Sequence, residues 1–235
     1  GRESASPSTS AGPTTTSPPP TPSQLDAVVA DISDFVARER DLPFAQPVKV
    51  AMLADDAFSE RVAADAVEDE KALTETEDVL RALGLLRRGV SLTETLRSFL
   101  AQGVVGFYDP KTDELVVRGG ALTPYVRITL AHELTHALDD QHFELDRPDV
   151  DDADDERGIA FSSLVEGNAL RIQEEYKKSL TKAERDQADE EEAKLGQGID
   201  LSRIPRVIPE LIGFPYIFGP ALVAALADAG GDRRV

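Results

Sequence analysis

The sequence predicts an α+β protein that is mainly helical, with a small β-sheet or hairpin beside one central helix. Apolar residues recur every three or four positions over most of the chain after residue 24, which is typical of amphipathic helices. Two short runs rich in valine and aromatic residues, 104–108 and 114–117, flank a turn at 109–113 and predict a β-hairpin. All three histidines lie between positions 132 and 142, within and just after the helix predicted over 125–141.

Composition limits the classes of partner and of metal ligand. The chain has 235 residues and a net charge of −19, which argues against nucleic acid as a partner because phosphate binding needs clustered lysine and arginine. It contains no cysteine, so a metal ion could be bound only by histidine, aspartate and glutamate. No run of 18 or more apolar residues is present, so we expect no membrane span in this chain.

The first 24 residues are almost entirely serine, threonine, proline, alanine and glycine. Such a segment cannot bury enough apolar surface to fold, so we expect a disordered linker over 1–24 and one domain over 25–235. Linkers of this kind tether domains outside the cell, which favours a secreted or cell-surface protein with an upstream anchor; a simple disordered terminus is the alternative. The abrupt end after an apolar helix suggests a C-terminal truncation.

The domain divides into a helical N-terminal part, 25–100, and an active-site part, 101–235. In the first part we expect a helix from about 24 to 40, a strand over 48–53, and acidic helices over 56–70, 74–83 and 91–101. In the second part, after the hairpin, we expect helices over 125–141 and 159–179, a very polar helix over 181–194 that projects into solvent, and an apolar segment over 204–227, broken by proline and glycine, that packs back on the core.

The segment His132-Glu133-Leu134-Thr135-His136 carries the predicted chemistry. Two histidines four residues apart project from the same face of a helix, one turn apart, and can hold one Zn²⁺. Glu133 then points toward the same site from the side, where it can act as the general base for a metal-bound water. The apolar residues around this segment allow the helix to be buried, so we predict zinc ligands at His132 and His136.

The third ligand has two candidates. His142 lies at the offset used by metzincins, but Asp139 stands where that pattern needs glycine, and the only methionine, Met52, lies upstream rather than in a downstream Met-turn. Glu166 interrupts an apolar face of the helix over 159–179, and a carboxylate in such a place needs a partner. We therefore prefer Glu166 and keep His142 as the alternative.

The chain resembles a bacterial, largely actinobacterial, family of gluzincin-like HExxH zinc metallopeptidases. The resemblance lies in the segments 131–143 and 163–169 and in the flanking runs 103–110 and 214–219. The resemblance covers most of 95–225 and implies a minimal gluzincin fold, in which a glutamate from a following helix completes the His-His-Glu zinc site. One position departs from well-studied gluzincins: Leu170 stands where many have an aspartate that orients a zinc-bound histidine. Asp140 or Asn168 could take that role.

Two further features are candidates for substrate contact. Tyr216 lies in the apolar segment that could fold over the cleft, and its hydroxyl is a candidate donor to the oxyanion of the reaction, with a place in the core as the alternative. The hairpin strand beside the metal helix could pair with an extended peptide, or could only cover the core.

These observations predict a zinc-dependent peptidase that acts on a peptide or protein substrate. A non-catalytic surface binding protein, with a structural zinc or no metal, is the main alternative, and a zinc hydrolase of a non-peptide amide is a third. The intact Glu133 favours catalysis, because a structural zinc site has no use for a base at that position.

Overall fold

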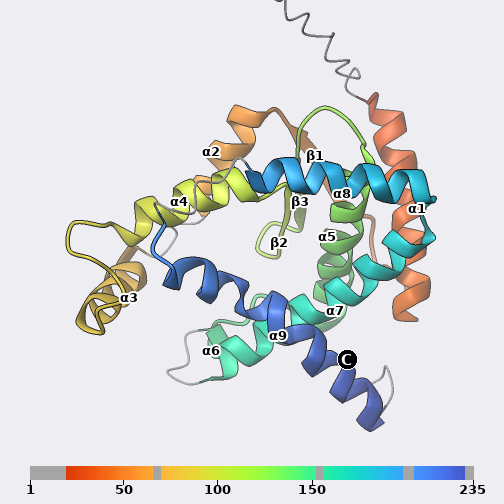
Figure 1. The fold of residues 1–235 in the computed structure, drawn as a ribbon. Helices are drawn as coiled ribbons and strands as arrows, with labels where there is room; N and C mark the ends of the chain where they lie inside the picture. Colours follow the sequence, from red (N-terminus) through yellow and green to blue (C-terminus); the bar gives the residue numbers. More distant parts are fainter. Residues whose placement is uncertain (1–19, 66–69, 152–155, 198–203, 231–235) are drawn as a thin grey trace, which may run out of the picture.

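The computed structural model describes residues 20–65, 70–151, 156–197 and 204–230, and shows a mainly helical chain with one small sheet (Figure 1). In chain order its elements are α1 Pro22–Arg40, β1 Lys49–Leu53, α2 Asp55–Asp65, α3 Glu70–Ala82, α4 Leu92–Gly103, β2 Gly106–Asp109, β3 Glu114–Arg118, α5 Pro124–Phe143, α6 Pro148–Asp151, α7 Arg157–Ser179, α8 Lys182–Gln197 and α9 Val207–Gly230. The mainly α architecture with a small β component is therefore confirmed.

The sheet has three strands in the order β1-β3-β2. The predicted hairpin is confirmed: β2 pairs antiparallel with β3, and Tyr108 lies opposite Leu115. The predicted strand β1 pairs parallel with β3, with Val50 opposite Leu115. In the described part of the chain β2 is thus an edge strand, and both β2 and β3 contact α5.

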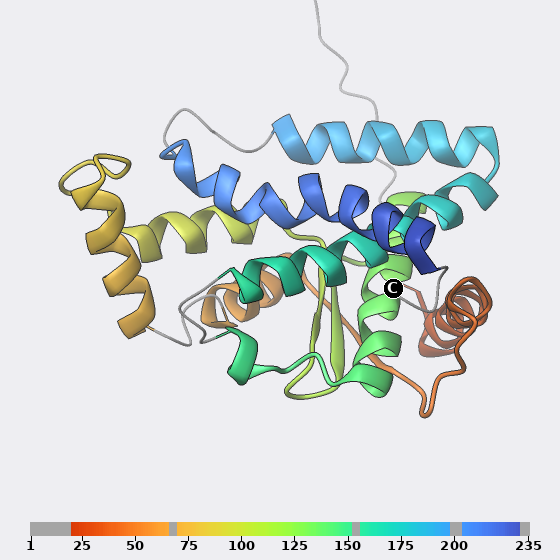
Figure 2. The ribbon, with the colours of Figure 1, turned by 90° about the horizontal axis from the view of Figure 1, so that it is seen from below.

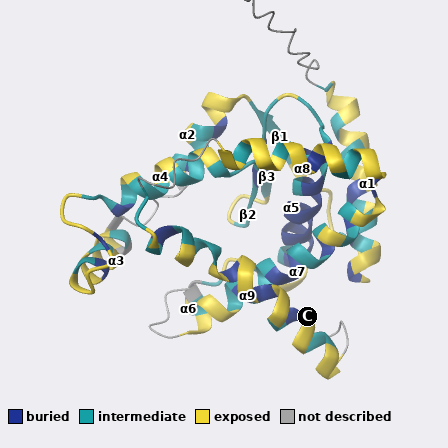
Figure 3. Cartoon of the chain, viewed as in Figure 1, coloured by how far each residue is buried: buried dark blue, intermediate teal, exposed yellow. Residues whose placement is uncertain are grey.

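Helix α5 is the centre of the core. It contacts α1, α7, α8 and the strands β2 and β3, and residues 130–139 are all buried (Figure 3). The helix begins behind Thr123, whose hydroxyl accepts a hydrogen bond from the Val126 N–H, and Pro124 fits its first turn because no helical N–H is needed there. Burial on every side means that any polar group in this stretch needs a partner inside the protein.

Several predicted boundaries were wrong. Helix α1 begins at Pro22 behind a capping box of Thr21 and Gln24, so three residues assigned to the linker belong to the helix; the earlier linker residues lie outside the described part. Helix α3 includes residues 71–73, which we placed between two helices, and the predicted end of the preceding helix over 66–69 lies outside the described residues. Helix α8 does not project into solvent: it packs on α5, buries Ala188, and is bound by an ion pair of 2.6 Å from Arg127 to Glu184.

Helix α9 was expected to be broken, but Val207–Gly230 forms one helix that contains Pro215 and Pro220. It lies along α7, between α7 and α8 in the view of Figure 2, and packs on α7 at Ser163 and Gly167. The two helices meet at Gly167 and Gly219, where a Cβ on either residue would overlap the backbone of the other helix. By length and composition alone α9 is also apolar enough to cross a membrane, a test that core helices of soluble proteins pass as well.

Candidate metal centre

The buried turn of α5 places three polar side chains at one point. His132, Glu133 and His136 are only 6%, 8% and 9% exposed. The two imidazole rings lie 4.7 Å apart between centroids, and their Nε2 atoms are 3.0 Å apart. The predicted helical spacing thus brings both Nε2 atoms to the same spot.

Helix α7 supplies the third group. Glu166 Oε2 lies 3.1 Å from His132 Nε2 and 3.5 Å from His136 Nε2. In the described part of the chain, His132, His136 and Glu166 form a group that could hold a metal ion, which we call the metal group. Glu166 is the third ligand that we preferred because of its apolar surroundings. The close packing of α7 against α5 brings the carboxylate to the histidines.

The distances among the three ligand atoms fit a zinc ion. Donor atoms held about 2.0–2.1 Å from a tetrahedral zinc lie roughly 3.3–3.4 Å from one another. The three observed separations of 3.0, 3.1 and 3.5 Å surround that value. Two histidines and a carboxylate are also a ligand set that leaves the fourth tetrahedral position open, as catalytic zinc sites require.

The same geometry perturbs proton binding. Burial alone would lower the pKa of His136, but the negative charge of Glu166 outweighs it and raises that pKa to about 9. Burial alone would raise the pKa of Glu166, but the adjacent histidines outweigh it and hold that pKa well below its usual range. Without a metal the site therefore keeps a proton on His136, and a divalent cation must displace that proton.

Glu133 is held at the side of this group. Its Oε2 accepts a hydrogen bond of 3.0 Å from the backbone N–H of Tyr108 on β2. Strand β2 can approach this closely because residue 106 is glycine: a Cβ there would lie 3.0 Å from the Thr129 side chain. Burial raises the pKa of Glu133, and the positive charge of His132 opposes that rise. A raised pKa makes the Glu133 carboxylate a stronger base than an exposed glutamate.

Behind the metal group lies a buried ionic network that the sequence did not predict. Arg40 of α1 donates two hydrogen bonds, of 2.8 and 2.6 Å, to one carboxylate oxygen of Asp139. Asn168 of α7 donates a bond of 2.6 Å to the other oxygen. Because Asp139 follows His136 by three residues on α5, this network ties α1 and α7 to the turn that carries the two histidines. The only sequence signal was a charged residue inside an apolar helix.

The other sequence candidates lie elsewhere. The Nε2 atom of His142 is 2.8 Å from the carbonyl oxygen of Pro43, so the structure does not bring it to the metal group. Asp140 binds the Tyr108 hydroxyl at 2.7 Å and the Leu145 N–H. Neither Asp140 nor Asn168 contacts a histidine Nδ1 atom; in the described part of the chain both Nδ1 atoms are buried without a hydrogen-bond partner. The predicted orienting role is therefore not found for either residue.

Tyr216 is brought to the site by α9. Its ring stacks on the imidazole of His132, with centroids 6.2 Å apart and planes 17° apart. The residue as a whole is 43% exposed, but partial burial of the phenol, followed by the negative charges of Glu166 and Glu133, raises its pKa well above its usual range. The hydroxyl therefore keeps its proton at neutral pH and can donate a hydrogen bond beside the metal group.

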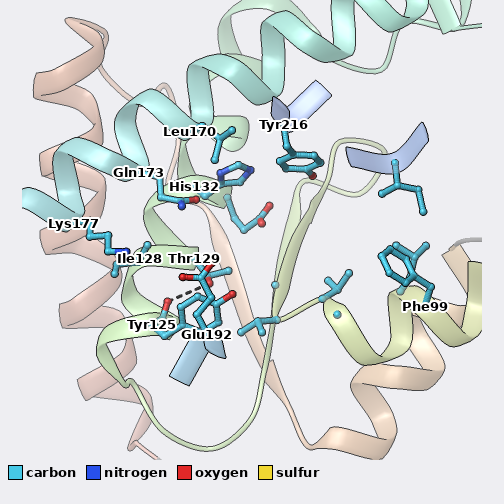
Figure 4. Close-up of a pocket in the computed structure, with 17 residues that line it drawn as sticks. Phe99, Tyr125, Ile128, Thr129, His132, Leu170, Gln173, Lys177, Glu192 and Tyr216 are labelled. Atoms are coloured by element: carbon cyan, nitrogen blue, oxygen red, sulfur yellow. Dashed lines mark hydrogen bonds between the residues drawn. The ribbon is translucent and has the colours of Figure 1, made fainter. Parts of the chain in front are cut away.

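Two cavities adjoin the metal group. The larger, about 420 Å³, is lined by His132, Glu133 and Tyr216, and extends away from the site between α4, α5, α7, α8 and α9 (Figure 4). The smaller, about 230 Å³, is lined by His136 and Glu166 together with Tyr108 and Pro110. One cavity is lined by His132 and the other by His136 and Glu166, so the metal group lies between the two cavities.

The chain matches no protein-family model, no curated protein and no solved structure.

Proposed function

We propose that the protein is a zinc-dependent peptidase, with zinc bound by His132, His136 and Glu166. The observation that carries the proposal is the convergence of two imidazole nitrogens and one carboxylate oxygen, at separations that fit zinc, directly beside a fourth buried group that can act as a base. A purely structural site would have no use for Glu133 at this position. The cavities on both sides of the group provide room for substrate residues on both sides of a scissile bond.

Bound zinc would supply Lewis-acid activation of a water molecule and of the substrate carbonyl. Glu133 would take the proton from the attacking water, held in position by the bond from the Tyr108 N–H. It would then pass that proton to the leaving amine. Tyr216, protonated and stacked on His132, would donate a hydrogen bond to the oxygen that gains negative charge.

Strand β2 would align the substrate. Just before β2, the Val105 carbonyl accepts a hydrogen bond from the Arg118 N–H of β3. Backbone groups alternate in direction along an antiparallel strand, so those of Gly106 and Tyr108 point away from β3. Gly106 lines the larger cavity and Tyr108 the smaller one. An extended peptide lying along this edge would therefore pass from one cavity to the other across the metal group.

The test is peptide cleavage by the zinc-loaded protein, assayed on a mixture of unmodified peptides by mass spectrometry. We expect the wild type to cleave internal peptide bonds. The cleavage rate of Glu133→Gln should be lower by roughly 10²- to 10⁴-fold, because the base is lost while the ligands remain. Glu144→Gln, a change in an exposed carboxylate just after the same helix, is the matched control and should keep the wild-type rate. Zinc content must be equal in all three proteins. Wild-type cleavage that survives Glu133→Gln would contradict the mechanism, and zinc-loaded protein without any cleavage would favour a structural zinc in a binding protein.

A further inference from the structure

We propose that the larger cavity is a specificity pocket that selects peptides with a bulky apolar side chain, such as phenylalanine or leucine, next to the scissile bond. The proposal rests on the proposed function, since it assigns the substrate class of the same site. Its basis is the composition, size and charge of the cavity walls.

The apolar walls of the cavity come from four helices. They are formed by Phe99 and Leu100 of α4, Ile128 of α5, Leu170 of α7 and Ile212 of α9. Figure 4 shows Leu170 and Tyr216 on either side of His132, with Phe99 across the cavity. Leu170 is the position at which the family resemblance would place an orienting aspartate. Here its side chain forms part of the cavity wall beside His132 instead.

The size of the cavity suits a large side chain. About 420 Å³ is well above the volume of a small residue and lies within the roughly 300–1,000 Å³ typical of ligand pockets. His132 and Glu133 form part of the cavity wall, so the side chain of a residue bound at the metal group can reach into the cavity. The pocket therefore acts on the residue adjacent to the bond that is cut.

The charges around the cavity argue against an acidic side chain. Gln173, Lys177 and Glu192 lie at the end away from Phe99 (Figure 4). The Lys177 ammonium is bound to the Asp189 carboxylate at 2.6 Å, so its charge is already compensated. Glu192 is exposed at the rim. A charged substrate group that entered the apolar part would lose water without gaining a free partner, whereas an apolar group loses nothing.

The experiment measures binding, so that it does not depend on turnover. The ligands are N-acetyl amino-acid hydroxamates, whose hydroxamate group chelates zinc while the side chain varies among phenylalanine, leucine, glycine, lysine and aspartate. Isothermal titration of the zinc-loaded protein should give affinities for the phenylalanine and leucine compounds roughly 10- to 100-fold above that for glycine, since burial of one large apolar side chain supplies this factor. The lysine and aspartate compounds should bind no better than glycine.

Two variants locate the selection. Leu170→Trp fills the cavity and should reduce the preference for phenylalanine over glycine at least tenfold, and Ile212→Trp should act in the same direction from α9. Val165→Trp, on the same helix α7 but lining the smaller cavity, is the matched control and should keep the preference. Zinc content and thermal unfolding establish that each variant is folded.

Three results would overturn the pocket assignment. They are equal affinities of the wild type for all five compounds, a preference for lysine or aspartate, and a preference for phenylalanine that both Trp variants leave intact. These outcomes are distinct from failure of the proposed function. Selective hydroxamate binding without peptide cleavage would support the pocket and reject the peptidase. Peptide cleavage without selective hydroxamate binding would support the peptidase and reject the pocket.

Discussion

Replacing Arg40 by methionine should strongly destabilise the protein, although residue 40 lies far from the metal ligands in sequence. The Arg40 and Asp139 side chains are only 3% and 6% exposed, and the guanidinium supplies two of the three hydrogen bonds to the carboxylate. Methionine preserves most of the volume but leaves a buried carboxylate with one neutral donor. Breaking a buried ion pair in this way costs about 3–5 kcal/mol.

The assay is thermal unfolding of the metal-free protein at pH 7, followed by circular dichroism. For a chain of this length each kcal/mol lowers Tm by about 2–4 °C, so Arg40→Met should lower Tm by about 6–20 °C. Arg38→Met is the matched control: Arg38 lies on the same helix, is exposed, and places its guanidinium over the Phe35 ring, so the change should stay within about 1 kcal/mol.

A double variant checks the cause. Arg40→Met combined with Asp139→Leu removes both charges, and it should unfold at a higher temperature than Arg40→Met alone because no buried carboxylate remains unpaired. A loss below about 1 kcal/mol in Arg40→Met, or a double variant less stable than the sum of the single changes, would refute the reasoning.

Three further predictions concern the site. Since the pKa of His136 is raised to about 9 without metal, zinc must displace one proton, and the apparent Kd should fall about tenfold per unit rise in pH between 6.5 and 8.5 in a chelator competition assay; a pH-independent Kd would contradict this. Tyr216→Phe should lower kcat roughly 10²- to 10³-fold with zinc content unchanged, and an unchanged kcat would remove the hydroxyl from the mechanism. Gly167→Ala should cost about 1–3 kcal/mol in urea unfolding because its Cβ overlaps Gly219, whereas Gly196→Ala, in open space on α8, should be neutral or stabilising; equal effects would contradict the close helix contact.

The local parts of the site could be predicted from the sequence. His132, Glu133 and His136 are fixed relative to one another by helical spacing alone, and Glu166 stood out as a carboxylate on an apolar helix face. The hairpin followed from its turn residues. Each of these features depends on residues that are near in sequence or on a polar group in an apolar pattern.

Long-range features could not be predicted in the same way. Arg40 and Asp139 are 99 positions apart, and nothing in the local pattern of either residue identifies the other as its partner. The parallel pairing of β1 with β3 likewise joins strands about 65 positions apart, as in the pair Val50 and Leu115. Helix α9 was misjudged because two prolines usually interrupt a helix, whereas here the close contact with α7 at Gly219 accompanies a continuous helix.

The central claim is that His132, His136 and Glu166 bind one zinc ion, and metal content tests it most directly. Elemental analysis of the wild type, Glu166→Ala and His142→Ala, each supplied with zinc and then dialysed, compares the two candidate third ligands. We predict one zinc per chain in the wild type and in His142→Ala, because the His142 imidazole is directed to the Pro43 carbonyl, and loss of zinc in Glu166→Ala. Full zinc in Glu166→Ala, or none in the wild type, would contradict the account.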